Sequence, residues 1–165
     1  MIFPQKAILT EDPHSARILV AHHLEHAVSA DGQNGMSVYS GSYKCVPIAL
    51  VCGPARPAHQ YAKQLGSTQI VYMGGCVSTM RRYPVGAVVL CGGDSVLLQK
   101  AQSAAAELSI PVVTGPCPGI VFDPIEASVL TVTENTETGE RLGEDEWRSR
   151  LYPAANLVFE TLATN

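Results

Sequence analysis

The sequence contains no run of about 18 consecutive apolar residues, the length that a membrane-spanning helix needs. It also has no excess of basic residues, because 15 Asp and Glu residues stand against 11 Lys and Arg residues. Nucleic acids and membrane surfaces attract proteins through such an excess, so we expect neither as a partner. The amino-terminal residues lack a charged segment followed by a long apolar one, and we therefore expect a cytoplasmic protein.

No Cys-x-x-Cys pair occurs among the five cysteines, and their odd number does not suit a closed set of disulfides. Cys52, Cys76 and Cys91 lie at or near the ends of apolar runs that are typical of strands. These features predict buried free thiols, and we expect neither a metal nor another cofactor.

The length and the alternation of apolar segments predict one α/β domain over residues 1–165. Continuous apolar runs predict buried strands at residues 6–10, 69–75, 86–93 and 128–134. Residues 36–44 and 46–53 follow each other too closely for a crossover connection, so they predict an antiparallel hairpin.

Between the strands, helical patterns begin at Pro13 and cover residues 58–66, 94–110 and 144–162. The last of these contains Pro153, which predicts a kink or a new helix start at that point. Together the elements predict a three-layer sandwich, in which helices cover both faces of a mixed, largely buried central sheet.

The segment VAHHLEH, residues 20–26, holds three of the five histidines and fits the H-x-x-E-H pattern of zinc peptidases. A zinc site needs a third protein ligand, whereas the acidic residues downstream cluster in a later loop and a separate helix. On a helix that begins near Pro13, His22 and His26 project opposite the apolar stripe. That stripe consists of Val20, Ala21, Leu24 and Val28. We therefore interpret the histidines as the outer face of the first helix, in contact with solvent or another subunit.

Four longer segments occur in one order: LTEDPHSARILVAHHLEHA, GMSVYSGSYKCVPIALVCG, IVYMGGCVSTMRRYPVGAVVL and, before the last helix, LTVTENTETGE. Together they resemble the nucleoside phosphorylase superfamily, which includes uridine and purine nucleoside phosphorylases. In that family an Asp-Pro turn opens the first helix, a Gly- and Tyr-containing hairpin follows, and a Gly-rich strand end comes next. The resemblance covers about residues 6–95 and resumes from about residue 121. It implies a nucleoside phosphorylase-like fold, while function has to be argued from the site.

The motif positions at which the phosphorolytic members bind phosphate carry other residues in this sequence. The replacements are Glu11 for a glycine, Ser15, Asn34 and Tyr72 for arginines, and Gly75 for a small hydroxyl residue. A carboxylate about 4 Å from an anion opposes it by about 4 kcal/mol at an effective dielectric constant near 20. The resemblance therefore implies a lost phosphate site, unless Arg17 and Arg56 rebuild it from a shifted register.

Hydrolytic members of the family place a carboxylate in the region of Glu11 to activate water, and the resemblance implies that role here. The pair Glu11 and Asp12 equally suits a helix N-terminus, where the helix dipole favours anions. Glu134, followed by Asn135, falls on the late family aspartate that protonates the leaving base, although turns often have this composition. Glu126 is similar to the family glutamate that binds the ribose hydroxyls.

The sequence thus predicts a protein that binds a nucleoside or a similar small heterocyclic ligand, with hydrolysis of an N-glycosidic bond as the favoured activity. The expected catalytic residues are Glu11 and Glu134. The expected ligand contacts are Asp12, Arg17, Arg56, Tyr72, Gly74, Gly75, Glu126 and Asn135. Two alternatives stay open: a non-catalytic or repurposed ligand-binding member of the fold, and a phosphorylase with a rebuilt phosphate site. We also expect a homo-oligomer, because members of the family share sites between subunits.

Overall fold

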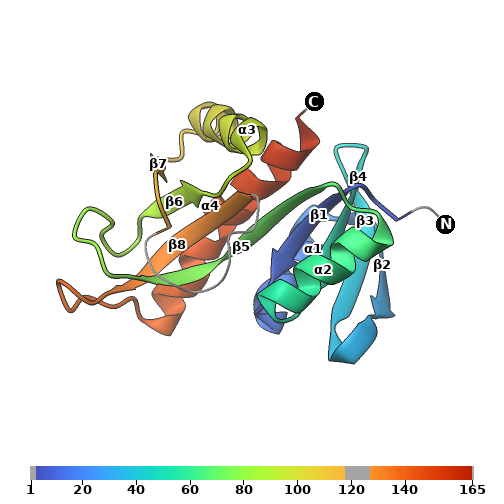
Figure 1. Ribbon diagram of the computed structural model, residues 1–165, viewed down its shortest axis with the longest axis horizontal. Helices are drawn as coiled ribbons and strands as arrows, with labels where there is room; N and C mark the ends of the chain where they lie inside the picture. The colour runs from blue at the N-terminus through green and yellow to red at the C-terminus, as the bar shows by residue number, and fades with distance from the viewer. Residues whose placement is uncertain (1–2, 118–126, 165) are drawn as a thin grey trace.

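The computed structural model of the protein describes residues 3–117 and 127–164. Its strands are β1 (Lys6–Thr10), β2 (Glu25–Asp31), β3 (Ser37–Tyr43), β4 (Val46–Cys52), β5 (Gln69–Ser78), β6 (Val88–Cys91), β7 (Val113–Thr114) and β8 (Ala127–Asn135). Its helices are α1 (Pro13–His23), α2 (Ala55–Leu65), α3 (Ser95–Glu107) and α4 (Glu144–Ala163), with a 3-10 turn η1 (Gln33–Gly35). The strands form one sheet in the order β2-β3-β4-β1-β5-β8-β6-β7 (Figure 1).

The sheet is mixed. Strands β4, β1, β5 and β8 run parallel, β3 runs antiparallel to β4, and β6 runs antiparallel to β8. The predicted hairpin is confirmed: Tyr43 pairs with Val46, and Lys44 and Cys45 form the turn with φ angles of 49° and 66°. Positive φ at both central residues is the geometry that matches the twist of a two-residue hairpin.

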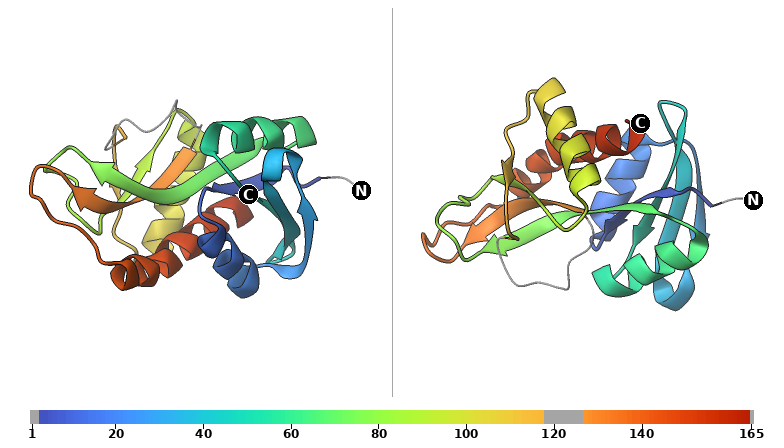
Figure 2. Two further views of the ribbon diagram at one scale, coloured as in Figure 1. Left: turned by 90° about the horizontal axis from the view of Figure 1, so that it is seen from below. Right: turned by 45° about the horizontal axis from the view of Figure 1, so that its top comes forward.

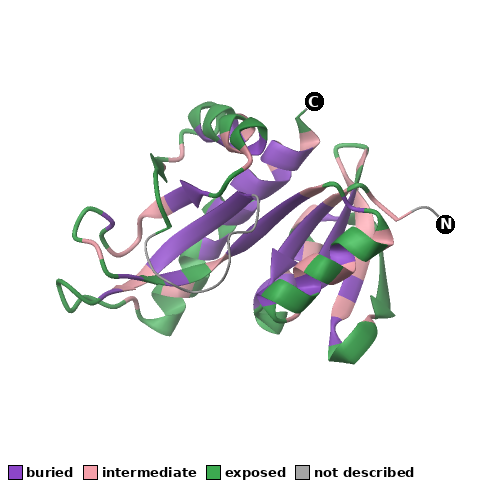
Figure 3. Ribbon diagram, viewed as in Figure 1, coloured by how far each residue is buried: buried purple, intermediate pink, exposed green. Residues whose placement is uncertain are grey.

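Helices cover both faces of the sheet, so the predicted α/β architecture is confirmed. Helices α1, α3 and α4 share one core with one face of the sheet, and α2 packs on the opposite face (Figure 2). The central strands are buried along most of their length, while the outer strands β2 and β7 are exposed (Figure 3). This burial explains the continuous apolar runs of the central strands.

The helix ends follow the signals in the sequence. The side chain of Asp12 caps α1, that of Asp94 caps α3, and Gly66, with φ of 111°, ends α2. Helix α4 continues through Pro153 as one helix, so of the two predicted outcomes a new helix start at that residue is wrong. Over the described residues, none of the helices combines the length and the apolar character needed to cross a membrane.

The interpretation of VAHHLEH as one helical face is wrong. Helix α1 ends at His23, Leu24 is its C-cap, and His26 lies in the edge strand β2 with φ of 54°. His23 packs against helix α4. Its ring stacks on Phe159 with the centroids 4.6 Å apart, and its Nε2 forms a hydrogen bond with Asn156 Oδ1 at 2.8 Å. The sequence prediction failed because β2 is exposed at all its positions, so it carries no apolar pattern and forms through its pairing with β3.

The prediction of buried thiols holds for three of the five cysteines. Cys52, Cys76 and Cys91 are buried, whereas Cys45 in the hairpin turn and Cys117 after β7 are exposed. The two exposed thiols lie outside the strands, which is why the apolar runs did not account for them.

Candidate functional site

Two of the predicted site residues meet at the carboxyl end of β1, where that strand ends beside the middle of the neighbouring parallel strand β5. Glu11 directly follows β1, and Tyr72 lies on β5 opposite Leu9. The Tyr72 hydroxyl donates a hydrogen bond to Glu11 Oε1 at 3.3 Å. Burial raises the pKa of Tyr72, and the charge and hydrogen bond of Glu11 raise it further, so the phenol stays protonated and acts as the donor.

Gly74 gives the tyrosine the space for this contact. A Cβ atom at Gly74 would lie 2.7 Å from the Tyr72 hydroxyl oxygen, closer than side-chain carbons approach. The glycine therefore lets the Tyr72 ring extend along the strand toward Glu11. We call Glu11, Tyr72 and Gly74 together the Glu11–Tyr72 site.

Asp12, one residue further, has a structural role at the start of α1. Its carboxylate accepts hydrogen bonds from the backbone N–H groups of His14 at 3.2 Å and Ser15 at 3.1 Å. It also accepts one from the Ser15 hydroxyl at 2.6 Å. Burial raises the pKa of Asp12, but the bonds from Ser15 and His14 outweigh burial and hold it below its ordinary value.

The two arginines that could rebuild a phosphate site flank the same end of the sheet. Arg17 is exposed on α1, and its Nε donates to the carbonyl oxygen of Pro13 at 3.3 Å. Its charge also reaches Cys52 at the end of β4, where it opposes the rise in the pKa of Cys52 caused by burial and by Asp12. Arg56 is exposed in the first turn of α2, which directly follows β4.

Gly75 and Glu134 face a different cavity. A Cβ atom at Gly75 would lie 2.9 Å from Thr133 Cγ2 and 3.3 Å from the Trp147 ring, on the side of the sheet that α4 covers. This cavity has a volume of about 500 Å³. It is lined by Gly75, Thr133, Glu134, Arg141, Leu142, Gly143, Glu144 and Trp147. Trp147, the single tryptophan, was not among the predicted site residues, because its position in a helical pattern does not show which face of the sheet it packs on.

The two predicted catalytic carboxylates therefore do not share a site. The pairing of β1 with β5 puts Glu11 level with Gly74, whereas Glu134 pairs with Val77, three residues further along β5. Three residues span about 10 Å of strand. In addition, β5 lies between β1, which Glu11 follows, and β8, which carries Glu134. Glu134 is engaged by Arg141, whose guanidinium donates to its Oε1 at 3.2 Å.

Asn135 is fully used by the fold. It is completely buried, and its amide nitrogen donates to the carbonyl oxygens of Met80 at 3.0 Å and Tyr83 at 2.9 Å. Its amide oxygen accepts from the backbone N–H groups of Glu137 at 2.9 Å and Thr138 at 3.2 Å. An asparagine side chain has two donor hydrogens and two acceptor positions, so none remains for a ligand. Glu126, the other predicted ligand contact in this part of the chain, lies outside the described residues.

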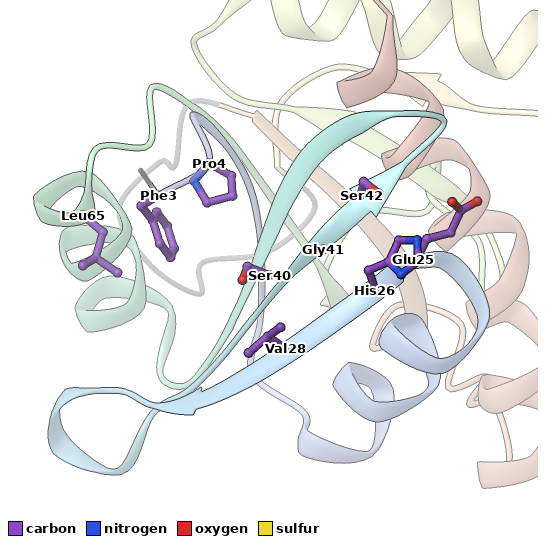
Figure 4. A pocket seen from close by; sticks show the side chains of 9 residues that line it. All are labelled: Phe3, Pro4, Glu25, His26, Val28, Ser40, Gly41, Ser42 and Leu65. Carbon is purple, nitrogen blue, oxygen red and sulfur yellow. The ribbon is translucent and has the colours of Figure 1, made fainter. Parts of the chain in front are cut away.

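Two further cavities contain none of the predicted site residues. One, of about 410 Å³, lies between the start of the chain and β2 and β3, with Phe3, Val28 and Leu65 on its walls (Figure 4). The other, of about 440 Å³, lies between α4 and the segment that precedes β7, with Ile110, Arg150 and Pro153 on its walls. In the part of the chain that the structure describes, no three His, Cys, Asp or Glu side chains group as metal ligands.

Comparisons with known proteins bear on the fold. No family model matches the chain, and no curated protein matches its sequence. Among solved structures, the chain is similar to the crystal structure of purine nucleoside phosphorylase from Toxoplasma gondii in complex with immucillin-H. The TM-score is 0.78 at 14% sequence identity, and the match covers 98% of this chain and 91% of that chain. The fold is nucleoside phosphorylase-like. At this identity the likeness shows the fold alone, so the activity has to be argued from the residues.

Proposed function

We propose that the protein binds a nucleoside or a similar small heterocyclic molecule at the Glu11–Tyr72 site and hydrolyses its N-glycosidic bond. The observation that supports this proposal is the hydrogen bond from the Tyr72 hydroxyl to Glu11, at the carboxyl end of β1. Ligands of open α/β sheets bind outside the carboxyl ends of the strands. The similar Toxoplasma protein was crystallised with immucillin-H, which adds support for a small-molecule ligand in this fold.

In the proposed reaction, Glu11 is the general base. A water molecule attacks the anomeric carbon, its proton passes to the Glu11 carboxylate, and the bond between that carbon and the base nitrogen breaks. The nitrogen leaves with the electron pair and takes up a proton from solvent. Tyr72 holds one oxygen of the carboxylate by its hydrogen bond and leaves the other oxygen available to water. Glu134 is not part of this mechanism, because the sheet register separates it from Glu11.

Hydrolysis is favoured over phosphorolysis because of the charge on Glu11. A phosphate dianion beside this carboxylate would be opposed by several kcal/mol, at the scale of about 4 kcal/mol per charge pair at 4 Å. Arg17 and Arg56 flank the same end of the sheet and are the residues that phosphorolysis would require.

The experiment measures release of free base from a panel of nucleosides, with and without inorganic phosphate. We expect release without phosphate, and we expect Glu11→Gln to slow it by at least about 100-fold, the scale of general-base catalysis. Glu107→Gln is the matched control, because Glu107 is an exposed carboxylate at the end of α3. Release that depends on phosphate would support the phosphorylase alternative, and absence of release across the panel would support a binding protein without this activity.

We also propose that copies of the chain associate. All residues of the edge strand β2 are exposed, and Val28, 59% exposed, lies beside the open cavity of Figure 4. An edge strand of this kind presents unpaired backbone groups to a second chain. Light scattering should give a multiple of the 17.6 kDa chain mass, reduced by Val28→Lys. A wild-type protein of single-chain mass would contradict this expectation.

A further inference from the structure

Two cysteines far apart in the sequence lie side by side. The Sγ atoms of Cys91 and Cys117 are 2.7 Å apart, although the two residues are 26 positions apart in the sequence. Cys91 is the last residue of β6 and is 1% exposed, while Cys117 follows β7 and is exposed. The sulfur atoms of a disulfide are about 2.05 Å apart, so a small movement of either side chain would allow a bond.

The backbone on the approach to Cys117 is held in place by two contacts with the sheet and its loops. The N–H of Gly115 donates to the carbonyl oxygen of Leu90 at 3.3 Å, which extends the parallel pairing of β7 with β6. The hydroxyl of Tyr83, a residue that is 1% exposed, donates to the carbonyl oxygen of Pro116 at 3.0 Å.

Gly115 makes this arrangement possible. A Cβ atom at position 115 would lie 2.5 Å from the Tyr83 hydroxyl oxygen, so the close approach of backbone and tyrosine needs a glycine. The two residues that precede Cys117 are thus fixed to the residue that precedes Cys91 and to a buried tyrosine. The meeting of the two thiols follows from these contacts and not from the sequence spacing.

We propose that Cys91 and Cys117 are a reversible oxidation site, which forms an intramolecular disulfide when the protein meets a peroxide. The Cys117 thiolate gives two electrons to the peroxide, which leaves a sulfenic acid on Cys117 and releases hydroxide. The Cys91 sulfur then attacks that sulfur atom, the S–O bond breaks, the S–S bond forms, and the thiol hydrogen leaves in water. In sum, two thiols and one hydrogen peroxide give one disulfide and two water molecules.

The surroundings of the three neighbouring thiols decide the order of these steps. Burial raises the pKa of Cys91, and the contact with Cys117 raises it further. Burial and the charge of Cys117 raise the pKa of Cys76 to about 12. Both buried thiols are therefore protonated at neutral pH and hidden from the oxidant, so Cys117 reacts first. Cys91 reacts second because it is in contact with Cys117.

The experiment uses the whole chain, reduced and then treated with dilute hydrogen peroxide, blocked by alkylation and digested with trypsin without reduction. The chain offers a clean assignment, because trypsin separates the cysteines into four peptides. These are residues 45–63 with Cys45 and Cys52, 64–81 with Cys76, 83–100 with Cys91, and 101–141 with Cys117. We expect peptides 83–100 and 101–141 to be joined, at a rate independent of protein concentration, and to separate again on treatment with a dithiol.

The variants use the two exposed cysteines as a matched pair. Cys117→Ser should abolish the joined peptides, and Cys45→Ser should form them as the wild type does. Both positions are exposed, so neither variant depends on repacking the core. The proposal is overturned if Cys117 stays fully alkylated after oxidation, or if it joins peptide 64–81, peptide 45–63 or a second chain instead. The readout needs no substrate, so it does not depend on the proposed hydrolysis.

Discussion

The clearest test of the site geometry is the removal of the Asn135 side chain. The sequence pattern predicted that Asn135 contacts a ligand, whereas in the structure its amide donates two hydrogen bonds to the backbone and accepts two from it. Asn135→Ala removes all four at once. A structural role predicts a loss of stability without ligand, and a ligand contact predicts a loss of binding with stability unchanged.

The size of the effect follows from which backbone groups lose their partner. Glu137 and Thr138 are exposed, so their N–H groups regain hydrogen bonds with water. The carbonyl oxygen of Tyr83 faces the buried amide and does not regain a partner, whereas that of Met80 keeps the hydrogen bonds from the Ser78 hydroxyl and the Tyr83 N–H. Four bonds at about 0.5–1.5 kcal/mol each, with two partly replaced by water, give a loss of about 2–4 kcal/mol. For a chain of this size that corresponds to a fall in Tm of roughly 5–15 °C.

Urea denaturation followed by circular dichroism measures this change in the free energy of unfolding. Gln102→Ala is the control, because it removes an exposed amide on α3 and should change stability by less than about 0.5 kcal/mol. If Asn135→Ala is as stable as that control, the proposed role of the four bonds is refuted. If Asn135→Ala keeps its stability and releases base more slowly than the wild type, the prediction that Asn135 contacts the ligand is supported.

Three further predictions concern stability. Burial raises the pKa of Glu160, but hydrogen bonds from Lys44 and Tyr43 outweigh this and hold it below its ordinary value. The stability that Glu160 contributes is therefore present above the ordinary carboxyl pKa and lost as the pH falls through the lowered value. Urea denaturation across a pH series should show that Glu160→Gln is less stable than the wild type near neutral pH and equally stable in acid. A difference in the free energy of unfolding that stays constant with pH would contradict this. Phe159 is 0% exposed, so Phe159→Ala should reduce the free energy of unfolding by about 3–5 kcal/mol in the same assay, and a loss below about 1 kcal/mol would be inconsistent with its burial. Under reducing conditions, Cys117→Ser should have the same free energy of unfolding as the wild type. After oxidation, its free energy of unfolding should be lower than that of the wild type by about 3–4 kcal/mol, the chain-entropy value for a disulfide across 26 residues. Equal stability of the two proteins after oxidation would count against the disulfide.

Much of the fold could be predicted because its signals are local. An apolar run that ends in glycine marks a buried strand wherever that strand sits in the sheet, and Asp94 before a helical pattern caps α3 in any context. The hairpin of β3 and β4 follows from the short connection alone. The strand β2 could not be found in this way, because all its positions are exposed.

The candidate site was only partly predictable. Glu11 and Tyr72 were both singled out, but their contact depends on β5 lying beside β1, which the sequence does not state. The separation of Glu134 from Glu11 depends on the register of β8 against β5. Trp147 joins its cavity only because α4 packs on that face of the sheet.

The sequence by itself determined the alternation of strands and helices, the helix caps and the hairpin, because each depends on neighbouring residues. The tertiary structure decided which polar groups meet. It brought Tyr72 to Glu11, turned the amide of Asn135 inward to four backbone groups, and set Cys117 against Cys91. The physical reason is that strand order and register place residues that are far apart in the chain within a few ångströms of each other, and no local pattern records those distances.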